Sequence, residues 1–355
     1  MSGVAWTGGS SALERRYRRL LLAYPGRYRR GHGAEIVTTL MELADDGQTR
    51  PGVSDAWHLV ASGIRQRFRL PGRRPLALVA AVLITVIGGA FGAAAGSWVA
   101  EQTFTGLPGD ARVAALTRQV ADSDRDFSMV RSTSPWWTGN VLGVADAPGW
   151  TPEAARARLA ADGWQVGSIE DRDGAAYEQR ADGTMVRVSS RGSEFEAARD
   201  GLRMQVTGYV SAEHGTVSIM LWPGGTGALR PAMTAGIVIG LVGGWLIAAA
   251  GAYRVRALPP GRRRVAVALT TASIAALATP AFAFWVNVMR VLHAHGSIVN
   301  TVHSALNATP YWSYATPWML LVLTIAGLAL AATAWAVTMR RPWAEPAVDQ
   351  IPTTH

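Results

Sequence analysis

Four long runs of apolar residues dominate the pattern of this 355-residue chain. Each contains the roughly 20 apolar residues that a helix needs to cross the hydrocarbon core of a bilayer. The runs occupy residues 75–100, 232–253, 265–287 and 317–339. We therefore predict an all-α membrane core of four transmembrane helices. The first run begins at Pro75, too late for a cleaved signal peptide, so we expect it to be retained as an anchor.

Arginine is unevenly distributed among the segments between these runs. Residues 1–74 hold 13 Arg and 6 acids, and residues 254–264 hold five Arg and no acid. Residues 101–231 hold 13 Arg and 17 acids, and residues 288–316 hold a single Arg. Arg-rich segments stay in the cytoplasm. We predict a multi-pass protein of the cell membrane with both termini, the tail 340–355 and the basic loop 254–264 inside, and with 101–231 and the loop 288–316 outside.

Residues 1–74 show apolar positions at helical spacing, which predict a small cytoplasmic three-helix domain. The first helix is expected at Ala12–Ala23 and ends before Pro25-Gly26. The second is expected at Gly33–Ala44. The third should begin with Ser54 as its N-cap and continue almost to the first membrane run.

Residues 101–231 combine a helical pattern with alternating segments, so we predict an extracytoplasmic α+β domain with an antiparallel sheet. Thr151, Pro152 and Gly163 predict a helix that ends near Asp162. We expect a further helix at 109–126 and irregular chain at 127–148. The expected strands are 164–169, 185–188, 202–210 and 217–221, with the third interrupted at Gly208 and paired with the fourth in a hairpin.

Glycines recur every fourth residue in the first two membrane runs. One set is Gly88, Gly92 and Gly96, and the other is Gly236, Gly240 and Gly244. Each set forms a stripe of small residues that allows two helix backbones to approach closely in a bilayer. We expect the two stripes to face each other; the alternative is chance in a chain with 38 glycines.

The composition excludes several classes of catalytic site. All 34 basic residues are Arg and the chain has no Cys. A Walker A lysine, a Schiff-base lysine, a thiol nucleophile and a cysteine-bound metal are therefore absent. Residues 101–231 contain one His, His214, and no hydrolase or metalloprotease motif. We predict a protein that is not an enzyme and needs no cofactor.

The net charge of +9 has an explanation other than nucleic acid. Basic residues on the inner side set the topology and face anionic lipid headgroups, so the bilayer is the expected partner and no nucleic acid is expected. Arg15, Arg16, Arg18 and Arg19 are interpreted in two ways: a solvated edge facing lipid, or a docking surface for an acidic cytoplasmic protein.

Three histidines lie close together in the loop 288–316: His293, His295 and His303. Such a group could bind a metal ion or respond to pH. The alternative is an interfacial helix with the histidines in water and with Ile298, Val302, Ala305 and Leu306 towards lipid.

The segment from Leu13 to Arg69 resembles a small helical domain at the N-terminus of actinobacterial membrane proteins. The matching features include Tyr24-Pro25, Tyr28-Arg29, Gly33, Glu35, Leu40, Pro51 and the stretch 59–69. Similar domains precede some permeases of the macrolide-exporter (MacB/FtsX) type, and genes of this kind often lie beside PadR-type regulators. The resemblance implies a cytoplasmic interaction module, with a regulator or an ATPase as its partner.

Two functions follow. The first is a non-enzymatic sensing or regulatory membrane protein that links an outer domain to the cytoplasmic helices. The second is a permease or transport-accessory subunit that works with a separate ATPase. The order of one helix, a large outer domain and three helices favours the second, whereas the short loop 254–264 and the absence of charged residues within the spans do not.

Overall fold

The computed structural model describes residues 12–44, 48–70, 75–125, 127–134, 136–179, 185–210, 214–293, 301–307 and 317–339. They fold as two compact units. One combines the chain up to Thr85 with Val242–Ile274 and the chain from Ala329, and the other combines Val86–Leu241 with Ala275–Leu328. Each unit contains parts of the long helices.

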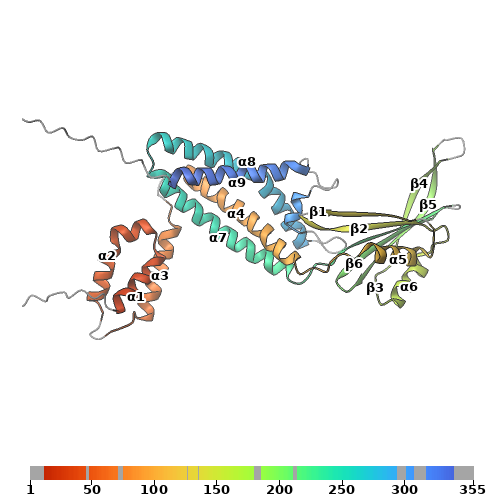
Figure 1. Ribbon diagram of the computed structural model, residues 1–355, viewed down its shortest axis with the longest axis horizontal. Helices are drawn as coiled ribbons and strands as arrows, with labels where there is room; N and C mark the ends of the chain where they lie inside the picture. Colours follow the sequence, from red (N-terminus) through yellow and green to blue (C-terminus); the bar gives the residue numbers. More distant parts are fainter. Residues whose placement is uncertain are drawn as a thin grey trace, which may run out of the picture. The chain divides into compact units, whose positions relative to one another are not determined.

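Among these described residues, four helices are long and apolar enough to cross a membrane, as predicted (Figure 1). They are α4 (Pro75–Glu101), α7 (Leu229–Arg256), α8 (Pro260–His293) and α9 (Pro317–Met339). Helices α7 and α8 extend beyond their apolar runs, so most of the segment predicted as a basic loop is helical. Arginine is a good helix former, and hydropathy marks the apolar part of a helix but not its ends.

The first unit contains a helical head, residues 12–70. Its helices are α1 (Ala12–Leu20), the 3-10 turn η1 (Leu21–Ala23), α2 (Gly26–Glu42) and α3 (Val53–Phe68). The three predicted helices are present, and their apolar faces form one core whose buried members are Leu13, Tyr17, Leu21, Tyr24, Val37 and Leu59.

Two helix starts in the head differ from prediction. Helix α2 begins directly after Pro25, seven residues before the predicted Gly33. The first two turns of α2 are mostly polar, so they lack the helical spacing of apolar residues from which the start was predicted. Helix α3 begins at Val53 with Gly52 in the N-cap position and no side-chain cap, so the prediction of Ser54 as the cap is wrong.

The second unit contains an inserted domain, residues 102–228, between α4 and α7. Its helices are α5 (Asp110–Ala121) and α6 (Pro152–Ala161). Its strands are β1 (Phe127–Ser134), β2 (Trp137–Asp146), β3 (Gln165–Val166), β4 (Glu170–Gln179), β5 (Met185–Arg199), β6 (Leu202–Val210) and β7 (Gly215–Pro223). They form one antiparallel sheet in the order β1-β2-β7-β6-β5-β3, with β4 also paired to β5.

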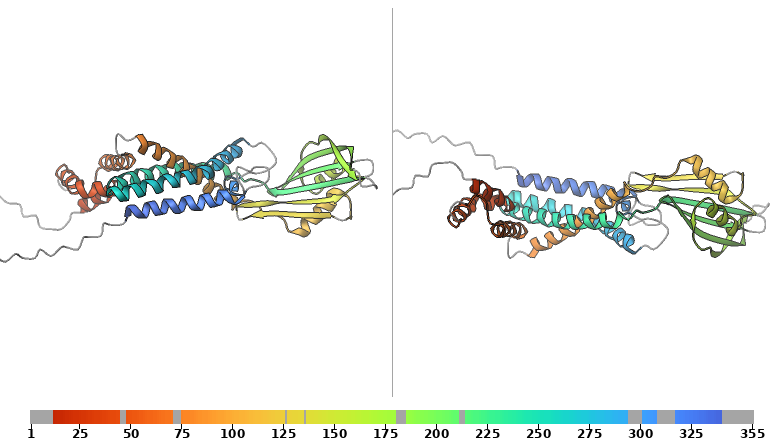
Figure 2. Two further views of the ribbon diagram at one scale, coloured as in Figure 1. Left: turned by 90° about the horizontal axis from the view of Figure 1, so that it is seen from above. Right: turned by 90° about the horizontal axis from the view of Figure 1, so that it is seen from below.

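Both helices of the inserted domain pack on the same face of the sheet (Figure 2). The strands supply alternate residues to this face; Val141, Val206 and Ile219 are fully buried there. Helix α5 contributes Val113 and Val120, which are also fully buried. The predicted α+β class and the β6–β7 hairpin are confirmed.

The sheet is larger than the sequence pattern indicates. Residues 127–148, predicted to be irregular, form the antiparallel hairpin β1–β2, with a register shift between Ser132 and Ser134. Strand β4 was not predicted because its sequence, EDRDGAAYEQ, has no apolar alternation. Gly208 does not interrupt β6; the indole of Trp150 packs against it and leaves no room for a side chain.

Candidate functional site

Helices α4 and α7 pack backbone to backbone along the predicted glycines. A Cβ atom built on Gly92 would collide with the carbonyl oxygen of Gly236 and would lie 3.0 Å from the Cα of Gly240. A Cβ built on Gly240 would collide with the carbonyl oxygen of Gly88. A Cβ on Gly96 would collide with the carbonyl of Ala232, and one on Gly244 would lie 2.8 Å from that of Ile84. We call this contact the glycine interface.

The same two helices hold both ends of the inserted domain. Helix α4 ends at Glu101 and α7 begins at Leu229. Just beyond these ends, the hydroxyl groups of Thr103 and Thr226 lie 2.8 Å apart. The two chain ends of the domain are therefore joined directly above a closely packed pair of helices.

A buried polar cluster lies at the same end of α4. The Oγ of Ser97 accepts hydrogen bonds from the backbone N–H groups of Val302 (3.1 Å) and His303 (3.3 Å). The Nδ1 of His303 lies 2.9 Å from this Oγ, and its Nε2 bonds to Oε2 of Glu101. The side chains of His303 and Glu101 are 5% and 7% exposed. Ser97 and Glu101 share one face of α4 because they are four residues apart.

Helix α8 holds the same segment from another side. The amide nitrogen of Asn287 donates to the carbonyl oxygens of Thr301 (3.1 Å) and Val302 (3.4 Å). Its amide oxygen accepts a bond of 2.9 Å from Arg290. Residues 301–303 are thus bonded to α4 through Ser97 and to α8 through Asn287.

The hydroxyl group of Ser97 is fully bonded in this cluster. A hydroxyl oxygen has two lone pairs, and the two backbone amides occupy both of them at Ser97. The carbonyl oxygen of Ala94, one turn earlier in α4, lies 3.0 Å from the same Oγ and accepts its hydrogen. The imidazole of His303 bridges this serine and the carboxylate of Glu101.

The cluster is built to anchor and does not present a nucleophile. In the Ser-His-Asp triad, the serine bonds Nε2 and the acid bonds Nδ1, and the hydroxyl faces a substrate. Here the two nitrogens are exchanged and Ser97 is fully buried. Its lone pairs are already bonded, so the hydroxyl ties the chain at His303 to α4.

The predicted histidine group is not brought together in the described residues. His303 is buried with Ser97, whereas His293 is exposed and its Nδ1 contacts the carbonyl of Met289. His295 and Ile298 lie outside the described residues. No group of three potential metal ligands occurs in the described part of the chain. The alternative, an interfacial helix, is contradicted at two of its residues, because His303, expected in water, and Val302, expected towards lipid, are both buried.

The arginines of α1 lie away from the core of the head. Leu13 and Tyr17 form the buried face of this helix. Arg15, Arg18 and Arg19 are exposed and Arg16 is half-buried. Arg18 forms an ion pair of 2.6 Å with Glu14, which contributes little at such an exposed site. Burial, together with the charge of Asp55, raises the pKa of the Tyr17 hydroxyl. The buried face of α1 therefore carries no charge, and the arginines lie on the other faces.

Sequence reasoning missed Ser97, Glu101 and Asn287. The sequence did contain a signal, since each of the three is a polar residue at the end of an apolar run. Solvation at the end of a membrane span explains such a residue equally well, so the signal alone does not indicate a buried cluster. A hydrogen-bond partner would distinguish a buried polar residue from a solvated one, but the partner of Ser97, His303, is 206 residues away in the chain.

No protein-family model, no curated protein and no solved structure matches the sequence. The resemblance of residues 13–69 to an N-terminal helical domain therefore stays a prediction.

Proposed function

We propose that this is a non-enzymatic, multi-pass protein of the cell membrane with a sensing or regulatory role. In this proposal the inserted domain lies outside the cell and receives a signal. The helical head lies in the cytoplasm and acts on a protein partner there. The distribution of arginine supports this orientation, since the head and the segment between α7 and α8 are the basic parts of the chain.

The observation that carries the proposal is the glycine interface beneath the inserted domain. Two helices that touch through their backbones cannot be displaced independently without losing that contact. A change in the distance or angle between Thr103 and Thr226 would therefore act on both helices. The polar cluster fixes α4 further, through Ser97 and His303.

Helix α7 carries the connection to the head. It is continuous from Leu229 to Arg256. In the second half of the helix, the indole N–H of Trp245 donates a 3.0 Å hydrogen bond to the carbonyl oxygen of Phe68, the last residue of α3. A continuous helix makes coupling between the inserted domain and the head feasible. A change in the head on binding of a ligand to the inserted domain would establish this coupling.

Hydrogen exchange of the intact protein in lipid nanodiscs tests the coupling. An antibody fragment against the inserted domain serves as the outer ligand. We expect its binding to change amide protection in residues 12–70. The control is Gly240→Leu, which separates α4 from α7 and should abolish the change while the fragment still binds. Unchanged protection in the head of the parent protein at saturation would contradict the proposal.

The second candidate is a permease-type subunit. The order of one long helix, a large domain and three further long helices supports it. Such a subunit would need a separate ATPase, because the chain has no lysine for a nucleotide-binding P-loop. Purification in mild detergent distinguishes the two: a co-purifying ATPase favours the permease role, and a regulator favours the sensing role.

A further inference from the structure

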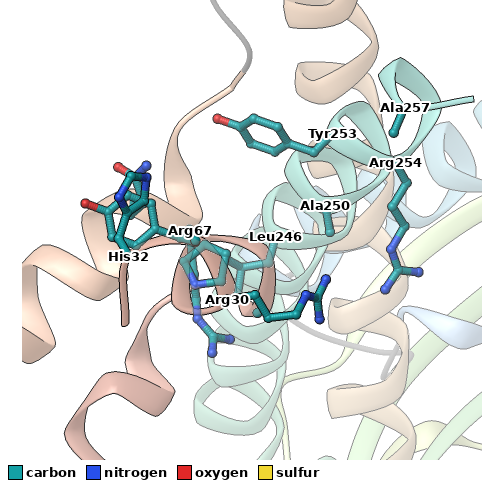
Figure 3. Close-up of a pocket in the computed structure, with 13 residues that line it drawn as sticks. Arg30, His32, Arg67, Leu246, Ala250, Tyr253, Arg254 and Ala257 are labelled. Carbon is teal, nitrogen blue, oxygen red and sulfur yellow. The ribbon is translucent and has the colours of Figure 1, made fainter. Parts of the chain in front are cut away.

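A cavity of about 1250 Å³ lies between the head and the last turns of α7 (Figure 3). All its lining residues belong to the first compact unit. They come from Pro25 and the start of α2, from the end of α3, and from the end of α7 with Ala257 directly after it. This volume exceeds the roughly 300–1,000 Å³ of ordinary small-molecule sites, so the cavity has room for more than an inorganic ion.

One part of the cavity is cationic. Arg30 of α2, Arg67 of α3 and Arg254 of α7 line it (Figure 3). No acid is found among the described residues that line it. Guanidinium groups present several N–H donors in a planar fork that matches phosphate oxygens. The lining therefore favours an anion, and a phosphate in particular.

Two of these arginines are held in position by other contacts. Arg67 donates from Nε and Nη2 to the carbonyl oxygens of Ala23 and Leu22, both at 2.6 Å. The guanidinium of Arg254 lies over the ring of Trp335, 4.0 Å from its centroid. These contacts fix the two cations before any ligand binds, which lowers the entropy cost of binding.

The other part of the cavity is apolar. Leu246, Ala250, Tyr253 and Ala257 follow one another at helical spacing, so they form one stripe along α7. The stripe begins within the apolar span of α7 and ends at its basic end. A ligand that fills both parts must carry an anionic group at one end and a hydrocarbon chain at the other.

We propose that this cavity binds one anionic phospholipid. The headgroup phosphate is held by Arg30, Arg67 and Arg254, and an acyl chain lies along the α7 stripe that starts at Leu246. A free phosphate shares the chemistry of the cationic part but would leave the apolar stripe unused. The proposal requires only that α7 spans a bilayer, and it does not depend on the sensing role.

Native mass spectrometry of the full chain in mild detergent tests this proposal. We expect one molecule of phosphatidylglycerol to bind, phosphatidylcholine to bind about tenfold more weakly, and inorganic phosphate not to displace the lipid. The double substitution Arg30→Gln with Arg254→Gln should weaken phosphatidylglycerol binding by about tenfold or more. The control, Arg19→Gln with Arg65→Gln, removes the same charge from exposed positions outside the cavity and should bind like the parent.

Equal affinity of the parent and the cavity variant for phosphatidylglycerol would overturn the proposal. Displacement of the lipid by inorganic phosphate would also overturn it, because the site would then be one for a small anion. Circular dichroism reports whether the double variant folds. If it does not, Arg30→Gln alone replaces it, since this exposed residue of α2 can lose its charge without disturbing a core, and unchanged binding by that variant would overturn the proposal equally.

Discussion

At the scale of single residues, the hydroxyl group of Ser97 makes three contacts with one distant segment, Val302 and His303. It bonds the backbone at Val302 and His303, and it lies within hydrogen-bonding distance of the imidazole. Alanine at this position would keep the helix and its packing but would remove the acceptor for two buried N–H groups. Such groups are rarely left unpaired in folded proteins.

Ser97→Ala should therefore destabilise the protein by about 1–3 kcal/mol, the cost of leaving buried donors unsatisfied. The measurement is thermal unfolding of the full chain in detergent. Thr234→Ala is the matched control, because this exposed hydroxyl bonds the carbonyl of Arg230 in its own helix. If both variants unfold at the temperature of the parent, the polar cluster does not anchor residues 301–303.

At the scale of elements, the glycine interface depends on which face of each helix the glycines occupy. Gly240 faces the backbone of Gly88. In contrast, no atom of another described element lies within 4 Å of a Cβ built on Gly243. These two residues are close in the same apolar helix. They provide a comparison in which the chemical change is identical and only the facing surface differs.

Gly240→Ala should destabilise the pair α4–α7 by about 1–3 kcal/mol, because the added methyl group forces the two backbones apart. Gly243→Ala should leave stability unchanged or raise it by up to about 1 kcal/mol, since alanine has the higher helix propensity. Unfolding in detergent, followed by circular dichroism, separates the two. Equal shifts for both variants would mean that the close approach of α4 and α7 contributes little.

At the scale of the whole molecule, the arrangement across the membrane is the property on which the proposed function rests. The chain has no native Cys, so a single introduced thiol can report the side on which a residue lies. Ser128 in β1 and Gly261 at the start of α8 are both exposed. They belong to segments that the arginine distribution places on opposite sides.

Ser128→Cys should react with a membrane-impermeant maleimide in intact cells, and Gly261→Cys should react only after the cells are permeabilised. Labelling of denatured protein serves as the control for thiol reactivity. Protection of the Cys at position 128 in intact cells would contradict the orientation proposed above and would remove the basis for an extracytoplasmic sensing domain.

The sequence by itself determined the features that depend on local pattern. The four long apolar helices follow from hydropathy along each run, and the limits of α6 follow from Pro152 and Gly163, whose φ of +84° suits a residue without a side chain. The hairpin β6–β7 follows from alternation within two neighbouring segments. The four-residue repeat of glycine likewise marked the faces on which α4 and α7 touch.

The tertiary structure alone decided the features whose partners lie far apart in the chain. Strand β4 has no apolar pattern of its own and exists because β5 supplies its hydrogen bonds. Ser97 acquires its role only when His303 is brought to it, and the cationic cavity forms only where α2, α3 and α7 meet. The free energy of such contacts depends on two distant segments together, so neither segment reveals it in isolation.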